Sequence, residues 1–237
     1  ESNGVLLVPN SFLKPEYAYS FEAGLKYNST DHQNFIELRS FTTLVSRHIV
    51  RSDFIVFSDQ STLSENTILY NGEEVITQAN KNLGNRFIYG GTLEGRWVIS
   101  NPIDLSGGIT YTTADKNSDY GPMPSIAPLF GTFTLSHKRK KLRSLLIWRF
   151  SEAKSPSQYS WGGEDGLIET PLINPQTLND VDRFFGMPSW SSWSFLAQYE
   201  FKKDVVFNLG LKNIFDRHYR TFASGISSEG RSLQFGI

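Results

Sequence analysis

The chain has 237 residues, of which 23 are basic and 24 acidic, so its formal net charge is −1. Proteins that bind a polyanion usually carry a basic surface, and this balance gives no reason to expect nucleic acid as a partner. The absence of cysteine excludes disulfide bridges, cysteine-ligated zinc and a thiol nucleophile. No apolar run reaches the roughly 18 residues of a membrane-spanning helix, whereas 14% aromatic residues and 19 glycines favour strands and turns.

Alternation of apolar and polar residues with period two dominates the sequence and predicts about nine strands. Phe21, Leu25 and Tyr27 alternate with polar residues, and the same pattern recurs toward the end of the chain. The second strand is less regular, because its apolar residues do not share one face, and we expect a β-bulge there. In chain order the predicted strands cover residues 17–28, 33–50, 84–100, 103–114, 127–138, 141–152, 191–201, 204–214 and 231–237.

The alternation alone fits two classes, a soluble all-β domain and a transmembrane β-barrel. The connections favour the barrel, because short polar turns alternate with long loops, as in outer-membrane barrels. The short ones lie at 101–102, 137–141 and 202–204, and the long ones at 52–83, 115–126, 153–190 and 217–230. Strands of ten or more residues also fit a tilted membrane span. Because single-chain bacterial barrels have even strand counts, nine strands predict a part of a larger barrel.

Several segments resemble the TonB-dependent outer-membrane receptors. Residues 13–16 and 21–27 read LKPE and FEAGLKY, and residues 88–94 read IYGGTLE. Residues 211–219 read LKNIFDRHY, similar to the family's segment before its last loop, and SGI at 224–226 with GR at 230–231 resembles the end of receptors from Bacteroidetes-like bacteria. The motif residues of this resemblance are Glu22, Gly24, Glu94, Asn213, Phe215, Asp216, Tyr219, Gly230 and Arg231.

The resemblance implies an all-β transmembrane antiparallel barrel of 22 strands, with residues 1–237 as about its last nine. It implies a transport receptor of a Gram-negative outer membrane that binds a scarce solute and imports it with energy from TonB. The expected partners are outer-membrane lipid, a plug and further strands outside these residues, TonB through that plug, and a surface lipoprotein. We expect no cofactor, no metal and no enzymatic activity, because no catalytic triad spacing, phosphate loop or dinucleotide fingerprint occurs.

Binding residues are expected in the long loop 153–190, because surface loops carry function on a rigid scaffold. Aromatic rings beside charged groups could contact a solute, although a packed loop that only covers the barrel mouth is equally compatible. The inward charges Glu22, Glu94, Arg96, Arg149, Glu200 and Lys212 are expected to form a structural network rather than a substrate path, and His48 and His218 to be solvated or interfacial. The candidate ligand-binding residues are Tyr159, Trp161, Asp165 and Arg183.

A soluble β-sandwich that binds carbohydrate is the alternative function. Its strands would have five or six residues, with similar loops at both ends.

Overall fold

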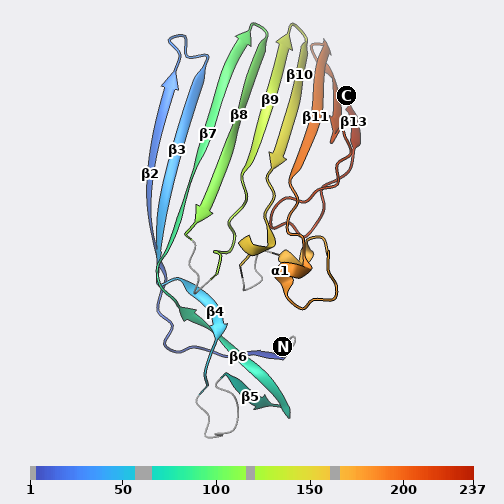
Figure 1. Ribbon diagram of the computed structural model, residues 1–237. Helices are drawn as coiled ribbons and strands as arrows, with labels where there is room; N and C mark the ends of the chain where they lie inside the picture. The colour runs from blue at the N-terminus through green and yellow to red at the C-terminus, as the bar shows by residue number, and fades with distance from the viewer. Residues whose placement is uncertain (1–3, 57–65, 116–120, 161–165) are drawn as a thin grey trace.

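A nine-stranded antiparallel sheet forms most of the computed structural model (Figure 1), which describes residues 4–56, 66–115, 121–160 and 166–237. Each strand pairs with its neighbour in the order β13-β12-β11-β10-β9-β8-β7-β3-β2. The sheet is open in this chain, with β2 and β13 at its two edges. Its strands are β2 (Tyr17–Asn28), β3 (Phe35–Ser46), β7 (Arg86–Ser100), β8 (Ile103–Ala114), β9 (Phe130–Arg139), β10 (Leu142–Ser151), β11 (Trp190–Lys202), β12 (Val205–Lys212) and β13 (Ser232–Gly236).

The nine predicted strands are therefore confirmed, with ends that differ by only a few residues. Short turns lie at one end of the sheet and long loops at the other, at the top and bottom of Figure 1. We call these the turn end and the loop end. Strands of up to 15 residues in a single layer do not fit a sandwich of short strands, so the alternative architecture is wrong.

The register separates two faces of the sheet. One row of paired residues crosses it from Tyr27 through Gly95 and Gly107 to Trp193, and residues of that parity form the outer face. The outer face is apolar and exposed: Leu25 is 75% exposed, and a stack of rings joins Phe133, Trp148 and Trp193. Residues of the opposite parity form the inner face, which carries most of the charges. An apolar face without cover is expected where lipid is the solvent.

The expected bulge in β3 is wrong. The strand pairs without interruption with β2 and β7, and it ends at Ser46 rather than near residue 50. The sequence pattern is irregular because apolar residues occur on both faces of β3. Phe35 and Phe41 face inward, whereas Ile36 and Leu38 face outward. The strand register shifts instead at the turn ends of β7 and β11.

A second, smaller sheet lies beyond the loop end (Figure 1), and three of its strands come from the segment between β3 and β7, whereas the fourth precedes β2 in the chain. Residues 52–83 of that segment were expected to be a long loop. Its central strand β6 pairs with β1 in parallel and with β4 and β5 antiparallel. The strands are β1 (Val5–Leu7), β4 (Ile49–Asp53), β5 (Thr67–Tyr70) and β6 (Glu73–Asn82).

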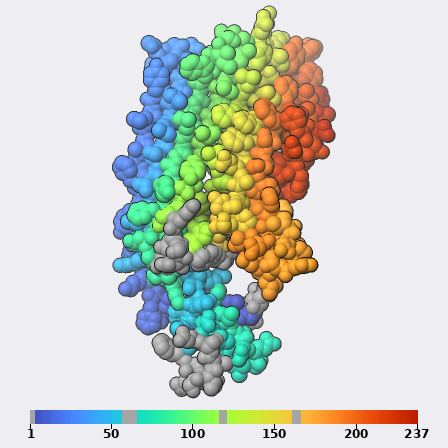
Figure 2. Space-filling model, viewed as in Figure 1, coloured from blue at the N-terminus to red at the C-terminus, as the bar shows by residue number. Residues whose placement is uncertain are grey.

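The only helical segments in the described residues are one turn long and belong to the loop 153–190. They are η1 (Pro156–Gln158), η2 (Leu167–Glu169) and α1 (Asp180–Arg183). In the part of the chain that the structure describes, no helix is long and apolar enough to span a membrane. The space-filling view shows the sheet as a tall slab with the loops gathered at its foot (Figure 2).

Candidate functional site

Opposite charges on the inner face of β2, β3 and β7 form a ladder across the strands. Glu37 accepts hydrogen bonds from Lys26 Nζ at 3.1 Å and from Arg39 Nε at 2.5 Å. The same guanidinium donates from Nη2 to Glu94 Oε1 at 2.8 Å. Glu22 lies on this face in the row next to Arg39, opposite Phe41. The ladder links three strands.

The other predicted inward charges are spread over the inner face. Arg96 Nη2 lies 3.3 Å from Asp104 Oδ1, and Lys212 Nζ lies 3.5 Å from Glu229 Oε1. Arg149 pairs in register with Thr132 and Ser192, and Glu200 with Val206. The structure does not bring these charges into one cluster. No group of three or more potential metal ligands occurs in the described residues.

A recess of about 490 Å³ opens on the inner face between β10 and β13. Polar side chains line much of it, and Gln198 Nε2 donates to Asn208 Oδ1 across the β11–β12 pair at 3.2 Å. Arg143 and Gln234 add further hydrogen-bonding groups, and Gly210 leaves room between them. The recess can therefore accept a polar protein segment or a solvated solute.

The long loop after β10 folds into a compact unit with its own small core. Tyr159, Leu167 and Phe184 are buried together, and Phe222 from the last loop packs against them. Backbone bridges from Lys154 to Met187 and from Leu172 to Phe184 close the loop on itself. The loop therefore has a defined surface of its own at the loop end.

Lys154 is the centre of this unit. Its side chain is 3% exposed, and Nζ donates to the carbonyl oxygen of Ile126 at 2.8 Å. The ammonium group also lies over two rings, 4.1 Å from the centroid of Phe222 and 4.8 Å from that of Tyr159. A buried cation is tolerated only when such partners replace water. Lys154 therefore links three loops that are distant in sequence.

The predicted ligand-binding residues fall in different surroundings. Tyr159 is 4% exposed and belongs to the small core, with its ring edge-on to Phe222. Arg183 ends α1, is partly exposed, and lies over the ring of Phe184 with its guanidinium carbon 5.5 Å from the centroid. Trp161 and Asp165 lie outside the described residues. The described pair thus comprises one core residue and one residue near the loop surface.

The motif residues after β12 form a hydrogen-bonded cluster, which we call the Asn213 cluster. Asn213 is buried, and its Nδ2 donates to the carbonyl oxygens of Arg217 at 2.9 Å and Glu229 at 3.1 Å. Its Oδ1 accepts from the backbone N–H of Arg217 at 3.0 Å. Asp216 Oδ1 accepts from the N–H of Arg231 at 2.7 Å. The two side chains join both ends of the last loop.

An aromatic stack and a glycine lie beside the Asn213 cluster. The ring of Tyr219 stacks on that of Trp190 with centroids 4.2 Å apart. A Cβ at Gly230 would lie 3.0 Å from Asp216 Oδ1, so a larger residue would crowd that carboxylate. Phe215 is 65% exposed. These contacts explain the motif residues of the Asn213 cluster by a structural role at the last loop.

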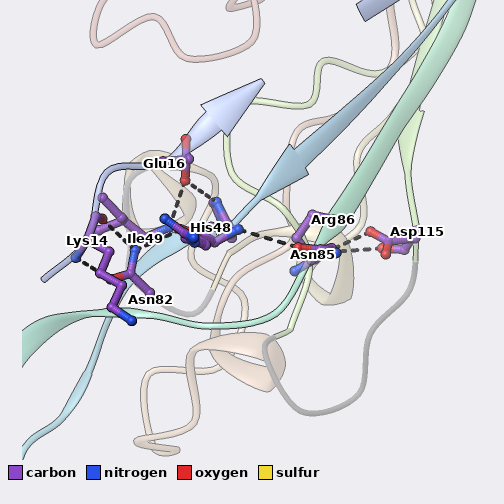
Figure 3. A network of polar contacts seen from close by, with 9 residues as sticks. Lys14, Glu16, His48, Ile49, Asn82, Asn85, Arg86 and Asp115 are labelled. Carbon is purple, nitrogen blue, oxygen red and sulfur yellow. Dashed lines mark hydrogen bonds and ion pairs between the residues drawn. The ribbon is translucent and has the colours of Figure 1, made fainter. Parts of the chain in front are cut away.

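A second polar network joins the two sheets (Figure 3). Glu16 Oε2 lies 3.0 Å from His48 Nδ1 and accepts from the N–H of Ile49 at 2.7 Å. Asn82 Nδ2 donates to the carbonyl oxygens of Lys14 and Arg47 at 2.8 and 2.9 Å. The expectation of a solvated His48 is wrong, because the residue is 6% exposed and sits between the segment before β2 and the start of β4.

Arg86, at the start of β7, is 1% exposed. Its Nε donates to Asp115 Oδ1 at 2.8 Å, and its other nitrogens donate to the carbonyl oxygens of Asp115 and Gly121. Beside it, the end of β8 and residues within 121–129 and 152–158 line a recess of about 480 Å³. Glu152, Lys154 and Gln158 are among its lining residues. This recess lies at the loop end and has both apolar and charged groups.

Sequence reasoning missed this recess and the buried cation beside it. The signal was weak, because Lys154 stands in a polar stretch and Phe222 lies in a different loop. The periodicity of a strand carries no information on such a loop-to-loop contact.

Comparison with known proteins gives a consistent result. A family model described as TonB dependent receptor-like, beta-barrel matches residues 1–214. No curated protein matched the sequence.

Solved structures share the fold at low sequence identity. The siderophore receptor PirA from Acinetobacter baumannii is 17% identical, with a TM-score of 0.68 over 96% of this chain and 32% of its own. A mutant of the ferric enterobactin receptor PfeA from Pseudomonas aeruginosa, in complex with enterobactin, is 17% identical, with a TM-score of 0.69 over 97% and 32%. The copper transporter OprC has 17% identity and a TM-score of 0.63 over 93% and 30%. This chain thus spans about a third of these proteins.

Proposed function

The chain belongs to the family of TonB-dependent receptor β-barrels, and on that premise we propose that it is part of an outer-membrane receptor that binds a scarce solute and imports it with energy from TonB. The protein would lie in the outer membrane of a Gram-negative bacterium. Its action would be binding and translocation, with no covalent chemistry and no cofactor of its own.

The observation that carries this proposal is the pair of contrasting faces on one sheet. The outer face exposes rings such as those of Phe21 and Tyr27, which are 68% and 67% exposed. The inner face carries paired charges such as Arg39 and Glu94. Lipid suits the first face and a hydrated lumen the second. The free edges at β2 and β13 require pairing within a bilayer, which supports further strands that complete the wall.

We propose that solute recognition occurs at the loop end, at the recess lined by the end of β8 and by residues within 121–129 and 152–158. Its mixture of charged and apolar lining suits a small polar solute with an apolar part. Arg183 is the described candidate best placed for direct contact, because it is partly exposed at the end of α1. Tyr159 would act by holding the loop, and Trp161 and Asp165 remain candidates for contact.

The inner-face recess between β10 and β13 is the place where we expect the plug to dock. Gln198, Asn208 and Gln234 offer donors and acceptors to a polar segment there. TonB would act through that plug at the turn end, and a surface lipoprotein would cover the loop end.

The test is transport by the complete receptor in its native cell. Cells that express it would be offered labelled iron chelates, copper, corrinoids and oligosaccharides in turn, with and without a functional TonB. We expect uptake of one class that requires both the receptor and TonB, and a receptor that leaves the outer membrane only in detergent. Release of the receptor without detergent, or uptake that is unchanged without TonB, would contradict the proposal.

A further inference from the structure

We propose that two basic turns at the turn end bind the phosphate-bearing headgroup of an anionic phospholipid, with its acyl chains along the outer face of β9–β11. The first comprises residues 138–141, which are the last two residues of β9 and the turn to β10. The second comprises residues 202–204, which are the last residue of β11 and the turn to β12. We call them the basic turns. The inference rests on the membrane placement proposed above and adds a specific lipid partner to it.

The basic turns lie side by side and are held together. The N–H of Glu200 donates to the carbonyl oxygen of Lys141 at 2.9 Å. Lys141 Nζ donates in return to the carbonyl oxygen of Phe201 at 3.0 Å. A positive φ of 51° at Lys140 turns the chain tightly between β9 and β10. The cations therefore share one fixed edge of the sheet.

Their charges are not balanced. The basic turns carry six exposed cations and one acidic residue, Asp204. The cations are Lys138, Arg139, Lys140, Lys141, Lys202 and Lys203. Among the described residues, Arg139, Lys140 and Lys203 take part in no ion pair. Several of the sheet's other described charges are paired, as in the ladder from Lys26 to Glu94. The edge formed by the basic turns therefore carries a net positive charge that attracts an anionic partner.

A largely apolar track leads from the basic turns into the membrane. Arg139 belongs to the outer face, where it pairs with Leu142, and Tyr199 follows on β11. The next row of that face holds His137, Ser144 and Ala197. Deeper rows are apolar, with Leu135, Leu146 and Phe195 and then the stacked rings of Phe133, Trp148 and Trp193.

The length of this track fits one lipid leaflet. Six residues along β9 separate Phe133 from Arg139, which corresponds to about 20 Å along a strand. At the tilt of about 40° of a barrel strand, this distance is about 15 Å along the membrane normal, which equals half of a hydrocarbon core. Short turns face the periplasm in such barrels, so the lipid belongs to the inner leaflet of the outer membrane.

Charge selects the anionic lipid over a zwitterionic one. Each Lys or Arg near a membrane surface strengthens binding to anionic lipid about fivefold. With three unpaired cations in one place, preference for phosphatidylglycerol over phosphatidylcholine should reach at least about tenfold after partial screening by salt.

The experiment uses the complete receptor in nanodiscs that hold equal amounts of phosphatidylglycerol and phosphatidylcholine. Lipids retained after release from the disc are counted by native mass spectrometry. We compare the wild type with Arg139→Gln/Lys140→Gln/Lys203→Gln. The matched control removes three exposed cations at the loop end, in Lys14→Gln/Arg51→Gln/Arg217→Gln, and a charge-preserving variant carries Arg139→Lys/Lys140→Arg/Lys203→Arg.

We expect the wild type, the control and the charge-preserving variant to retain phosphatidylglycerol, and the turn variant to lose the preference at least tenfold. Equal retention of both lipids by the wild type, or an equal loss in the loop-end control, would overturn the inference. A receptor that inserts in membranes and imports its solute but shows no lipid preference refutes this inference alone. A receptor that is soluble without detergent refutes the proposed function with it.

Discussion

Gly95 lies directly opposite Gly107 in the pairing of β7 with β8, on the outer face. A Cβ at Gly107 would lie 2.6 Å from the ring of Phe133 and would overlap the carbonyl oxygen of Thr132. A Cβ at Gly95 would lie 2.8 Å from the carbonyl oxygen of Phe35. The backbones approach one another so closely here that only glycine fits without a shift.

Gly107→Ala should therefore lower the free energy of unfolding of the receptor by about 1–3 kcal/mol, since overpacking forces the backbone to move. Gly24→Ala is the matched control, because its nearest neighbours would lie at an ordinary 3.8 Å. Urea unfolding in lipid vesicles, followed by tryptophan fluorescence, measures both. Equal stability of the two variants would contradict the close approach.

A charge on the outer face should be far more harmful than the same charge one residue away. Leu146 faces outward between Leu135 and Phe195, whereas Leu145 faces inward between Ser136 and Leu196. We expect Leu146→Arg to cost about 2–4 kcal/mol, as for a cation near the bilayer midplane. Leu145→Arg should cost less than half as much in the same unfolding assay. A larger effect at Leu145 would reverse our assignment of the faces.

The Arg86–Asp115 pair should be a point of weakness at the loop end. Asp115→Ala leaves a guanidinium that is 1% exposed without its carboxylate partner. Loss of one partner of a buried pair costs about 3–5 kcal/mol, and the value here should fall at the lower end because two carbonyl oxygens still accept from Arg86. The double variant Arg86→Met/Asp115→Ala should recover part of the loss in a thermal unfolding series. No recovery would show that the two residues act independently.

The stack of Tyr219 on Trp190 should stiffen the last loop. Removal of either ring exposes residues 214–230 to proteases, and a double-mutant cycle with Tyr219→Ala and Trp190→Ala should give a coupling energy of about 0.5–1.5 kcal/mol. Tyr219→Phe keeps the ring and serves as the control. Additive effects of the two alanine variants would rule out the stack as a source of stability.

Asp31 gives the turn between β2 and β3 a dependence on pH. Its carboxylate accepts from the Ser29 hydroxyl and from the N–H of Gln33, which lowers the pKa of Asp31 below its ordinary value. A lowered pKa in the folded state stabilises the turn above the ordinary pKa, and this is lost as pH falls through the lowered value. The hydrogen-exchange protection factors of residues 29–34, which are corrected for the intrinsic effect of pH on amide exchange, should therefore fall in acid, and Asp31→Asn should remove that dependence.

The strands of the large sheet could be predicted from the sequence because apolar and polar residues alternate along them, one kind on each face. Trp193, Phe195 and Ala197 are one such set. The small sheet escaped prediction because its buried face consists of Thr77 and Ala79, whereas the apolar Ile76 is 43% exposed. Hydrophobic periodicity therefore points to the wrong face of β6.

The loop-end contacts escaped for a different reason. The burial of His48 depends on Glu16, and that of Lys154 on Phe222, and neither partner is near in sequence. The alternation of apolar and polar residues within a segment gives no information about contacts with distant segments. The residues proposed to meet the solute remain predictions for the same reason.

The direct pairing of β3 with β7 has a consequence for how such a surface can diversify. The two strands are continuous neighbours in the wall, although residues 47–85 come between them in the chain. The segment 47–85, which supplies β4, β5 and β6 of the small sheet, thus begins and ends at adjacent strands of the wall. A lineage under pressure from antibodies or phages can exchange or reshape it while the wall keeps every backbone hydrogen bond. The same site offers engineers a position for grafting a foreign epitope.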